Sequence, residues 1–429
     1  MSSIIDHFHH PLNSLDDLTT RCIRCGFCLE SCPTFVVTGS ELESPRGRIY
    51  LARSASEGKL DWVEDVSPHM ERCLGCRACE TACPSGVKYG EILEIARDTI
   101  EHRRRDLPKT ILLESTTKPG LLKAQIALSR ILPGNKVPHL FSKWISGCAP
   151  EAEMPVPQKT ADLPELDESN LPAVKGEVYL LEGCAMRVLF PRVHQATRRL
   201  LRRIGYVVRE TDQGCCGAMH AHNGHLDEAR RLGTNLIKAM PDDLPVIVNS
   251  AGCGSTMKEY GELLSPPLPS EGEGSAVRDF ACRVKDASQF LLANGLLEAL
   301  ADAPGLATTA TYHDACHLAH GQRITSEPRE LLEAIPSLKL VPLPESDMCC
   351  GSAGIYNITE PTLARTLLDR KYANVATTGA NIVATGNPGC HAWIAQAARE
   401  HGDEVLVLHT MELLEAAFVG LKPFSDPKP

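Results

Sequence analysis

The residues best suited to chemistry in this chain are cysteines, which recur at regular spacing near the N-terminus. One run reads C-I-R-C-G-F-C-L-E-S-C-P at residues 22–33, and a second reads C-L-G-C-R-A-C-E-T-A-C-P at residues 73–84. Both follow the pattern C-x2-C-x2-C-x3-C-P, the arrangement of thiolates that binds a [4Fe-4S] cluster. Because the pattern occurs twice in strict register, the sequence predicts two such clusters and an electron-transfer role.

The last cysteine of each run is predicted to bind the cluster of the other run. The first three cysteines can face one cluster from a single loop, whereas the fourth lies one helical turn further on, as in two-cluster ferredoxins. The predicted ligands are Cys22, Cys25, Cys28 and Cys83 for the first cluster, and Cys73, Cys76, Cys79 and Cys32 for the second. Structural zinc and disulfides are the alternatives, but zinc ligands come in pairs rather than in triplets followed by Cys-Pro.

The composition is that of an ordinary globular protein with too few cysteines for a secreted disulfide scaffold. The chain has 429 residues, 43% of them hydrophobic, and 18 cysteines, which predicts two or three domains. Its net charge of −10 excludes nucleic acid as the main partner. The N-terminal segment has no signal-peptide pattern and no apolar run is long enough to span a membrane. We therefore expect a cytoplasmic protein whose cysteines are metal ligands.

The elements that position these cysteines are expected to form an α+β protein of four regions. Residues 1–105 are predicted to be a mostly helical, ferredoxin-type module, in which Ile92, Ile95 and Ile100 form the apolar face of a helix. Residues 106–175 are predicted to be a helical connector followed by a linker rich in proline and acidic residues. Residues 176–300 and 301–429 are predicted to be two copies of one α/β unit.

Alternation of short apolar runs with amphipathic segments predicts a mainly parallel sheet in each copy. The predicted strands are residues 178–181, 207–208 and 246–248, and then 310–313, 338–341 and 382–384. The predicted helices of the first copy are residues 192–204 and 226–240. A proline- and glycine-rich stretch at residues 265–275 is predicted to be a surface loop.

A second set of cysteines follows the predicted strands, four in each copy. They are Cys184, Cys215, Cys216 and Cys253, and then Cys316, Cys349, Cys350 and Cys390. Ligands of open α/β sheets bind at the carboxyl ends of the strands. These cysteines are therefore candidates for a further iron–sulfur or metal site, or for a redox-active thiol centre. The alternative is that they are small buried core residues.

Several histidines and arginines lie near the cysteines, and each one taken singly is expected to be structural. The histidines near the second copy are His313, His317, His320 and His391; an imidazole could replace a thiolate or relay protons. Three others, at His220, His222 and His225, are predicted to lie in a polar loop. Arg46 and Arg48 are candidates for offsetting the charge of anionic clusters or for docking a flavin subunit, or they are surface residues.

The motifs together resemble those of the glycolate oxidase iron–sulfur subunit family. L-E-G-C at 181–184, G-C-C-G at 214–217, G-C-G at 252–254, C-C-G-S-A-G at 349–354 and G-C-H at 389–391 resemble the duplicated cysteine-rich (CCG) domain. That domain also occurs in heterodisulfide reductase and in lactate-utilisation proteins. The S-P-R-G-R-I-Y segment at 44–50 and the C-P-S-G-V-K-Y segment at 83–89 make the resemblance strongest to the glycolate oxidase iron–sulfur subunit family. The final C-x-x-C of the reductase pattern is absent, because Thr256 and Trp393 occupy its last position.

The resemblance implies an electron-transfer subunit of a flavin-dependent complex that oxidises glycolate to glyoxylate. No dinucleotide fingerprint or P-loop occurs in this chain, and a two-electron oxidation needs a hydride acceptor. FAD is therefore expected on partner subunits only, with membrane quinone as a candidate acceptor at the inner face of the cytoplasmic membrane. No catalytic residue is assigned. The alternatives are a subunit serving lactate or glycerol 3-phosphate oxidation, and a thiol–disulfide enzyme.

Overall fold

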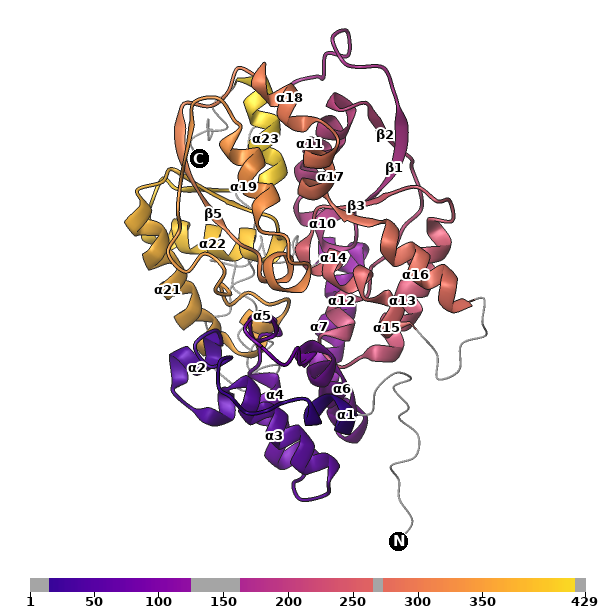
Figure 1. Ribbon diagram of the computed structural model, residues 1–429, viewed down its shortest axis with the longest axis vertical. Helices are drawn as coiled ribbons and strands as arrows, with labels where there is room; N and C mark the ends of the chain where they lie inside the picture. Colours follow the sequence, from indigo (N-terminus) through magenta and orange to yellow (C-terminus); the bar gives the residue numbers. More distant parts are fainter. Residues whose placement is uncertain (1–14, 125–162, 265–272, 421–429) are drawn as a thin grey trace.

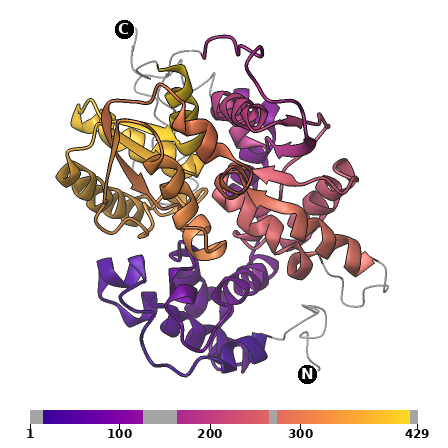
Figure 2. The ribbon, with the colours of Figure 1, turned by 45° about the horizontal axis from the view of Figure 1, so that its top comes forward.

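The computed structural model describes residues 15–124, 163–264 and 273–420. Figure 1 shows a helical N-terminal module at the base and two α/β halves side by side above it. Figure 2 shows the same arrangement from another direction, with the N-terminal module beneath both halves. Most of the predicted linker and of the predicted loop at 265–275 lie outside the described residues. None of the described helices is both long enough and apolar enough to cross a bilayer.

The N-terminal module consists of short helices around one apolar core. They are α1 (Leu15–Thr20), α2 (Pro33–Thr38), η1 (Glu41–Glu43), α3 (Pro45–Ser56), η2 (Trp62–Val66), α4 (Ser67–Glu71), α5 (Ala78–Thr81), α6 (Tyr89–Arg103) and α7 (Leu107–Thr117). The predicted apolar face of α6 is confirmed, because Ile92 and Ile100 are buried and Ile95 packs against the core. Pro33 begins α2 directly after Cys32, where a missing N–H costs nothing.

The first half contains a parallel four-stranded sheet in the order β2-β1-β3-β4. Its strands are β1 (Gly176–Leu181), β2 (Tyr206–Val208), β3 (Val246–Val248) and β4 (Val284–Asp286). Its helices are α10 (Ala185–Leu189), α11 (Pro191–Arg203), α12 (Ala218–Ala221), α13 (Leu226–Ala239), α14 (Ala251–Lys258), α15 (Tyr260–Leu263), α16 (Glu273–Arg283), α17 (Ala287–Ala293) and α18 (Leu296–Ala301). The predicted strands, helices and parallel pairing of this half are confirmed.

The second half repeats the topology, with the strand order β6-β5-β7-β8. Its strands are β5 (Thr308–His313), β6 (Leu338–Val341), β7 (Ile382–Thr385) and β8 (Leu406–His409). Its helical segments are η4 (His317–Gly321), α19 (Ser326–Glu333), α20 (Tyr356–Thr359), α21 (Pro361–Thr378), α22 (Pro388–His401) and α23 (Thr410–Val419). The predicted duplication is confirmed, and each half has a fourth strand, β4 or β8, that the sequence reasoning missed.

The two halves share one hydrophobic core. Leu200 and Leu201 of α11 are fully buried in the same cluster as Leu413 and Leu414 of α23. Beside this contact the buried Glu415 accepts hydrogen bonds from Arg199 at 2.6 Å and from Arg203 at 2.9 Å. The shared core fixes the two sheets relative to each other, so the cysteine-bearing loops of both halves are held at a constant separation.

Candidate iron–sulfur centres

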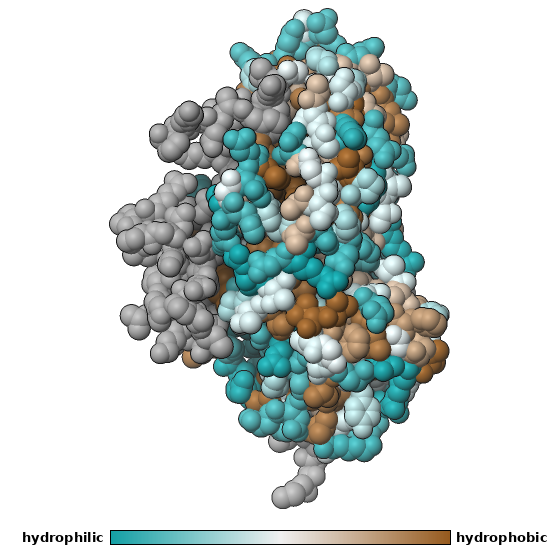
Figure 3. Space-filling model, turned by 90° about the vertical axis from the view of Figure 1, so that its left-hand side faces the viewer, coloured by the Kyte–Doolittle hydropathy of each residue, from teal (hydrophilic) through white to brown (hydrophobic). Residues whose placement is uncertain are grey.

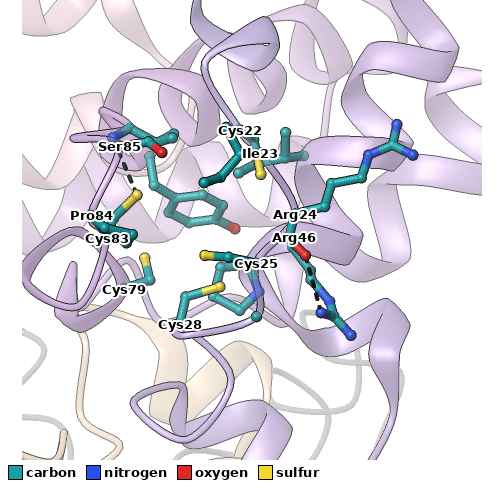
Figure 4. Close-up of a pocket in the computed structure, with 15 residues that line it drawn as sticks. Cys22, Ile23, Arg24, Cys25, Cys28, Arg46, Cys79, Cys83, Pro84 and Ser85 are labelled. Carbon is teal, nitrogen blue, oxygen red and sulfur yellow. Dashed lines mark hydrogen bonds between the residues drawn. The ribbon is translucent and has the colours of Figure 1, made fainter.

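A first cavity is lined by thiols from both cysteine runs. Cys22, Cys25 and Cys28 line it from the first run, and Cys79 and Cys83 from the second. Figure 4 shows the sulfur atoms of Cys25, Cys28 and Cys83 turned towards the same space. The structure therefore brings Cys83 to the first triplet across about fifty residues of sequence.

A second cavity lies next to the first and has the complementary set of thiols. Cys32 lines it together with Cys73, Cys76 and Cys79, and Tyr89 closes one side. The Tyr89 hydroxyl donates to Cys73 Sγ at 3.5 Å. Cys79 and Tyr89 line both cavities, so the two sites adjoin. The fourth cysteine of each run therefore lines the cavity of the other run, which is the arrangement that the spacing predicts.

The two cysteine loops share an unusual backbone. Positive φ angles occur at the same two positions of each run, at Arg24 (58°) and Gly26 (88°) and at Gly75 (63°) and Arg77 (63°). A residue in this conformation turns successive backbone N–H groups towards one side of the loop, which favours an anion. In the second loop the Gly75 N–H donates to Cys73 Sγ at 3.4 Å. The loops therefore offer amide donors as well as thiolates.

The two cavities differ in burial. Cys25 is exposed and the other three assigned cysteines of the first cavity are half-buried. All four thiols of the second cavity are at most 8% exposed. Burial raises the pKa of the Cys76 and Cys79 thiols well above the usual range, so a bound metal must supply the charge that deprotonates them.

Arg48 is buried beside the second cavity, so the surface alternative is wrong for this residue. It is 0% exposed and donates to the Glu43 carboxylate at 2.7 Å, to the Glu43 carbonyl at 2.6 Å and to the His69 carbonyl at 2.7 Å. The guanidinium therefore places a fixed positive charge next to Cys32 and Cys73. Arg46, in contrast, lies at the rim of the first cavity and pairs with Glu41 at 2.5 Å.

The second cysteine loop is packed against both α/β halves. On the side of the second half, His317 Nε2 donates to the Gly75 carbonyl at 2.9 Å, and His320 hydrogen-bonds Thr81 at 3.0 Å. On the side of the first half, Arg77 pairs with Glu259 at 2.5 Å. These partners give His317 and His320 a structural role in holding the loop.

Cys76 of this loop lies next to a cysteine of the second half. The contact is made by their sequence neighbours, since His317 donates to the Gly75 carbonyl at 2.9 Å; burial raises the pKa of the Cys76 thiol, and Cys316 adds to this effect. Cys76 also belongs to the same buried cluster as Cys349, Cys350 and Cys390. The inner cavity of the N-terminal module therefore faces the cysteines of the second half directly.

The eight cysteines of the two halves gather at the carboxyl ends of the strands, as expected. In the first half Cys184 contacts Cys215, Cys215 contacts Cys216, and Cys216 contacts Cys253. In the second half the same chain of contacts runs through Cys316, Cys349, Cys350 and Cys390. Among the described residues all of these cysteines are free thiols. The segments that flank Cys253 and Cys390 contact each other across the interface, where the Gly252 N–H donates to Asn387 Oδ1 at 3.4 Å.

Comparison with known proteins places these features in a family. A probable glycolate oxidase iron–sulfur subunit of Bacillus subtilis is 35% identical over 92% of this chain and 94% of its own length. The glycolate oxidase iron–sulfur subunit of Escherichia coli is 33% identical over 94% of this chain and 95% of its own length. The chain belongs to the glycolate oxidase iron–sulfur subunit family. A fumarate reductase (CoM/CoB) subunit from Methanothermobacter marburgensis is a more distant relative, 26% identical over 92% of this chain and 72% of its own length.

The domain profiles agree with this family. The 4Fe-4S dicluster domain matches residues 19–87, and the cysteine-rich domain matches residues 178–258 and again 310–395. These matches confirm the predicted fold class, a helical dicluster module followed by a duplicated cysteine-rich α/β domain. They also support an electron-transfer role for this member of the glycolate oxidase iron–sulfur subunit family.

Two histidines depart from the sequence-based expectations for this family member. His220 does not lie in a polar loop, because it belongs to α12 and is 2% exposed. The loop prediction failed because α12 spans a single turn, too short for a helical period. His313, at the end of β5, is 0% exposed and interacts with the Cys350 thiol, and among the described residues neither ring nitrogen has a partner of ordinary hydrogen-bond geometry. Thr256 and Trp393, at the positions of the missing cysteines, are both buried.

Proposed function

We propose that this chain is the electron-transfer subunit of a flavin-dependent complex that oxidises glycolate to glyoxylate. The observation that carries the proposal is the pair of adjoining thiol-lined cavities, one with an exposed thiol and one whose four assigned thiols are all buried. A [4Fe-4S] cluster bound in each cavity supplies one-electron transfer. FAD is proposed to lie on partner subunits, which is consistent with the absence of a dinucleotide fingerprint in this sequence.

The donor atoms of each cavity fit a [4Fe-4S] cluster. The proposed ligands are Cys22, Cys25, Cys28 and Cys83 in the outer cavity, and Cys73, Cys76, Cys79 and Cys32 in the inner cavity. Four thiolates per cavity, amide donors from the loop and the buried charge of Arg48 all favour an anionic group. Among the described residues, those that line the inner cavity include no carboxylate that would oppose such a group.

The different burial of the thiols in the two cavities supports an order of electron transfer between the two sites. Cys25 is exposed, so a partner can approach the outer site closely. Cys79 lines both cavities and links the outer to the inner site. Cys76, at the far side of the inner site, lies beside Cys316 of the second half. We therefore propose transfer from partner to outer site, to inner site and on to the second half, with membrane quinone as the final acceptor.

The eight cysteines of the two halves are proposed as a further iron–sulfur site. Their support is the mutual contact of four free thiols in each half and the position of the second group beside the inner cavity. The contact of the adjacent thiols Cys215 and Cys216 favours one other candidate function, thiol–disulfide exchange. That alternative predicts reduction of disulfide substrates and no iron beyond the two clusters.

The surface proposed to meet the flavin subunit surrounds the outer cavity. Ile23 and Phe27, which lie between the cysteines of the first run, are 68% and 69% exposed, and Tyr50 nearby is 53% exposed. Arg24 stacks over the Tyr50 ring at 5.1 Å. Figure 3 shows hydrophobic side chains on the lower part of the molecule, where the N-terminal module lies. Exposed apolar and aromatic side chains with an arginine are typical of interface centres.

The test is reconstitution of this chain with its co-purified flavin subunits under anaerobic conditions. Glycolate is expected to bleach the visible absorbance of the clusters, and the subunits without this chain are expected to reduce only their flavin. Lactate and glycerol 3-phosphate are the comparison substrates. Bleaching by either of these but not by glycolate would replace the proposed substrate, and no bleaching by any of them would reject the flavin-to-cluster path.

A further inference from the structure

His313 is the buried polar group that the proposed path leaves unexplained. It ends β5, three residues before Cys316, and its side chain is completely inaccessible. One of its ring nitrogens, Cys350 Sγ and Cys390 Sγ all lie within 4.8 Å of one another. The imidazole interacts with the Cys350 thiol, and among the described residues neither nitrogen has a partner of ordinary hydrogen-bond geometry. A buried imidazole without well-formed hydrogen bonds is unfavourable, so its position favours a ligand held between it and the thiols.

The first half offers a natural comparison because it lacks this histidine. Leu181 ends β1 three residues before Cys184, as His313 ends β5 three residues before Cys316. In the part of the chain that the structure describes, no group of three potential metal ligands in the first half includes a cysteine. The two copies therefore share their cysteines but differ at this position. His220 of the first half acts electrostatically on Cys215, but it groups with Glu114 and Glu228 and not with two thiols.

We infer that His313 is a nitrogen ligand of an iron in the second half, shared with Cys350 and Cys390, and that the first half cannot form the same centre. This inference rests on the proposed iron–sulfur site of the α/β halves and deepens it. Binding requires a neutral imidazole and two thiolates, so two thiol protons are released when the iron binds. In the C-x-x-C pattern, the last cysteine would stand at position 393 and supply a further ligand, which Trp393 cannot do. The His313 imidazole supplies a donor in its place.

The charge of the ligand set gives this centre a function. A neutral imidazole in place of a thiolate makes the iron site less negative, and histidine ligation raises the reduction potential of an iron–sulfur centre. The second half also lies directly beside the inner cavity through Cys76 and Cys316. The second half is thereby suited to be the electron-accepting end of the chain, while the first half is not.

The test uses the full-length chain purified anaerobically with its own iron. Iron is counted, and pulsed EPR of a reduced or oxidised paramagnetic state measures hyperfine coupling to 14N. The wild type is expected to hold more than about eight irons and to show an imidazole nitrogen coupling. His313→Leu, which copies the first half, is expected to lose both the coupling and the additional iron. His313→Cys is expected to keep the additional iron and lose the coupling.

His391→Phe is the matched control, since His391 is also a buried imidazole of the second half and adjoins Cys390. It is expected to retain both the iron and the nitrogen coupling. Absence of the coupling in the wild type, or its persistence in His313→Cys, would overturn the inference. A wild type with only about eight irons would remove the second-half centre and this inference with it, but would leave the two-cluster proposal standing. Loss of those eight would reject the proposed function itself.

Discussion

At the scale of single residues, the two cysteine runs are interlocked. Cys83 lines the cavity of the first run and Cys32 lines that of the second. Neither run supplies all four assigned thiols of its cavity, so the two loops must fold together before either proposed cluster can have four ligands. Cluster assembly and folding of the N-terminal module are therefore expected to be coupled.

The position of Cys83 in the outer cavity and of Cys32 in the inner cavity predicts which substitutions alter the same EPR signal. Cys83→Ser is expected to alter the same EPR signal as Cys25→Ser, and Cys32→Ser the same signal as Cys76→Ser. Each variant is expected to lose up to about four irons. EPR of the reduced proteins, with iron analysis, compares the four variants. If Cys83→Ser instead shared its altered signal with Cys76→Ser, the proposed ligand exchange would be wrong.

Arg48 is expected to be the residue of the module whose loss costs most stability. Arg48→Met leaves the buried Glu43 without its closest cation, and breaking a buried ion pair destabilises by about 3–5 kcal/mol. The control is Arg53→Met, because Arg53 forms an exposed i,i+4 pair with Glu57, and solvent screens such a pair so that it contributes little. Urea unfolding of both variants measures the difference. Equal effects would show that burial of Arg48 contributes nothing.

The thiols that the structure gathers at the two cavities include all eight that the cysteine spacing assigned; that they bind clusters stays a prediction. The sequence left open whether Arg48 offsets the charge of a cluster or lies at the surface, and it placed His220 in a polar loop, although both side chains are buried. Arg48 donates to the Glu43 carbonyl of η1 and to the more distant His69 carbonyl. No local pattern around either residue reports such a tertiary contact, whereas a cysteine triplet carries its chemistry within seven residues.

At the scale of elements, the first cysteine loop combines a candidate cluster site with exposed apolar side chains. Phe27→Glu is expected to slow reduction of the clusters by the glycolate-reduced flavin subunits at least about tenfold, the effect of losing an interface residue worth about 1.4 kcal/mol. Iron content is expected to stay unchanged, since Phe27 is 69% exposed. Stopped-flow absorbance measures the rate. The control is Leu297→Glu, at an exposed apolar residue of α18. It is expected to leave the reduction rate unchanged.

The cap of α23 predicts a pH dependence of stability. His409 Nδ1 accepts from the Met411 N–H at 3.2 Å, and Nε2 donates to the Asn249 carbonyl of the other half at 2.8 Å. Burial, with His391 nearby, lowers the pKa of His409 to about 3. Below about pH 6.5 the His409 side chain therefore binds a proton in the unfolded chain but not in the folded chain. Stability from this group is complete above pH 6.5 and is lost as the pH falls.

At pH 5 the loss from His409 is expected to be about 2 kcal/mol relative to pH 7, at about 1.4 kcal/mol per pH unit. His409→Gln keeps a polar side chain that does not titrate, and the other buried histidines act equally in both proteins. Urea unfolding at the two pH values is the measurement. The same loss in His409→Gln as in the wild type would contradict this assignment.

The strands that the sequence reasoning missed, β4 and β8, each form one of the two edges of their sheet. β4 is V-K-D, with Lys285 exposed between two buried residues, and β8 is only four residues long. Length alone does not explain the omission, because β2 and β3 are three residues long and were predicted; in β4 the charged central residue interrupts the apolar run that identifies a buried strand. Their strand state comes from pairing with β3 and β7. The central strands were predictable because they are continuous apolar runs buried on both faces.

At the scale of the whole molecule, the duplicated halves act as a support for one side of the N-terminal module. Arg97 of α6 donates to the Cys73 carbonyl at 2.7 Å and to the His222 carbonyl of the first half at 2.6 Å. His317 ties the same cysteine loop to the second half. The loop that carries Cys73 and Cys76 of the inner cavity is thus held by both halves, whereas Cys25 of the outer cavity is exposed. This difference supports the proposed direction of the electron path.

The most direct test of the central claim is iron and acid-labile sulfide analysis of the anaerobically purified chain, combined with EPR after reduction. The account predicts at least about eight irons with matching sulfide and the signals of two neighbouring reduced [4Fe-4S] clusters. Stoichiometric zinc without iron or sulfide would contradict it, because the paired cavities would then be structural metal sites and the chain could not carry electrons.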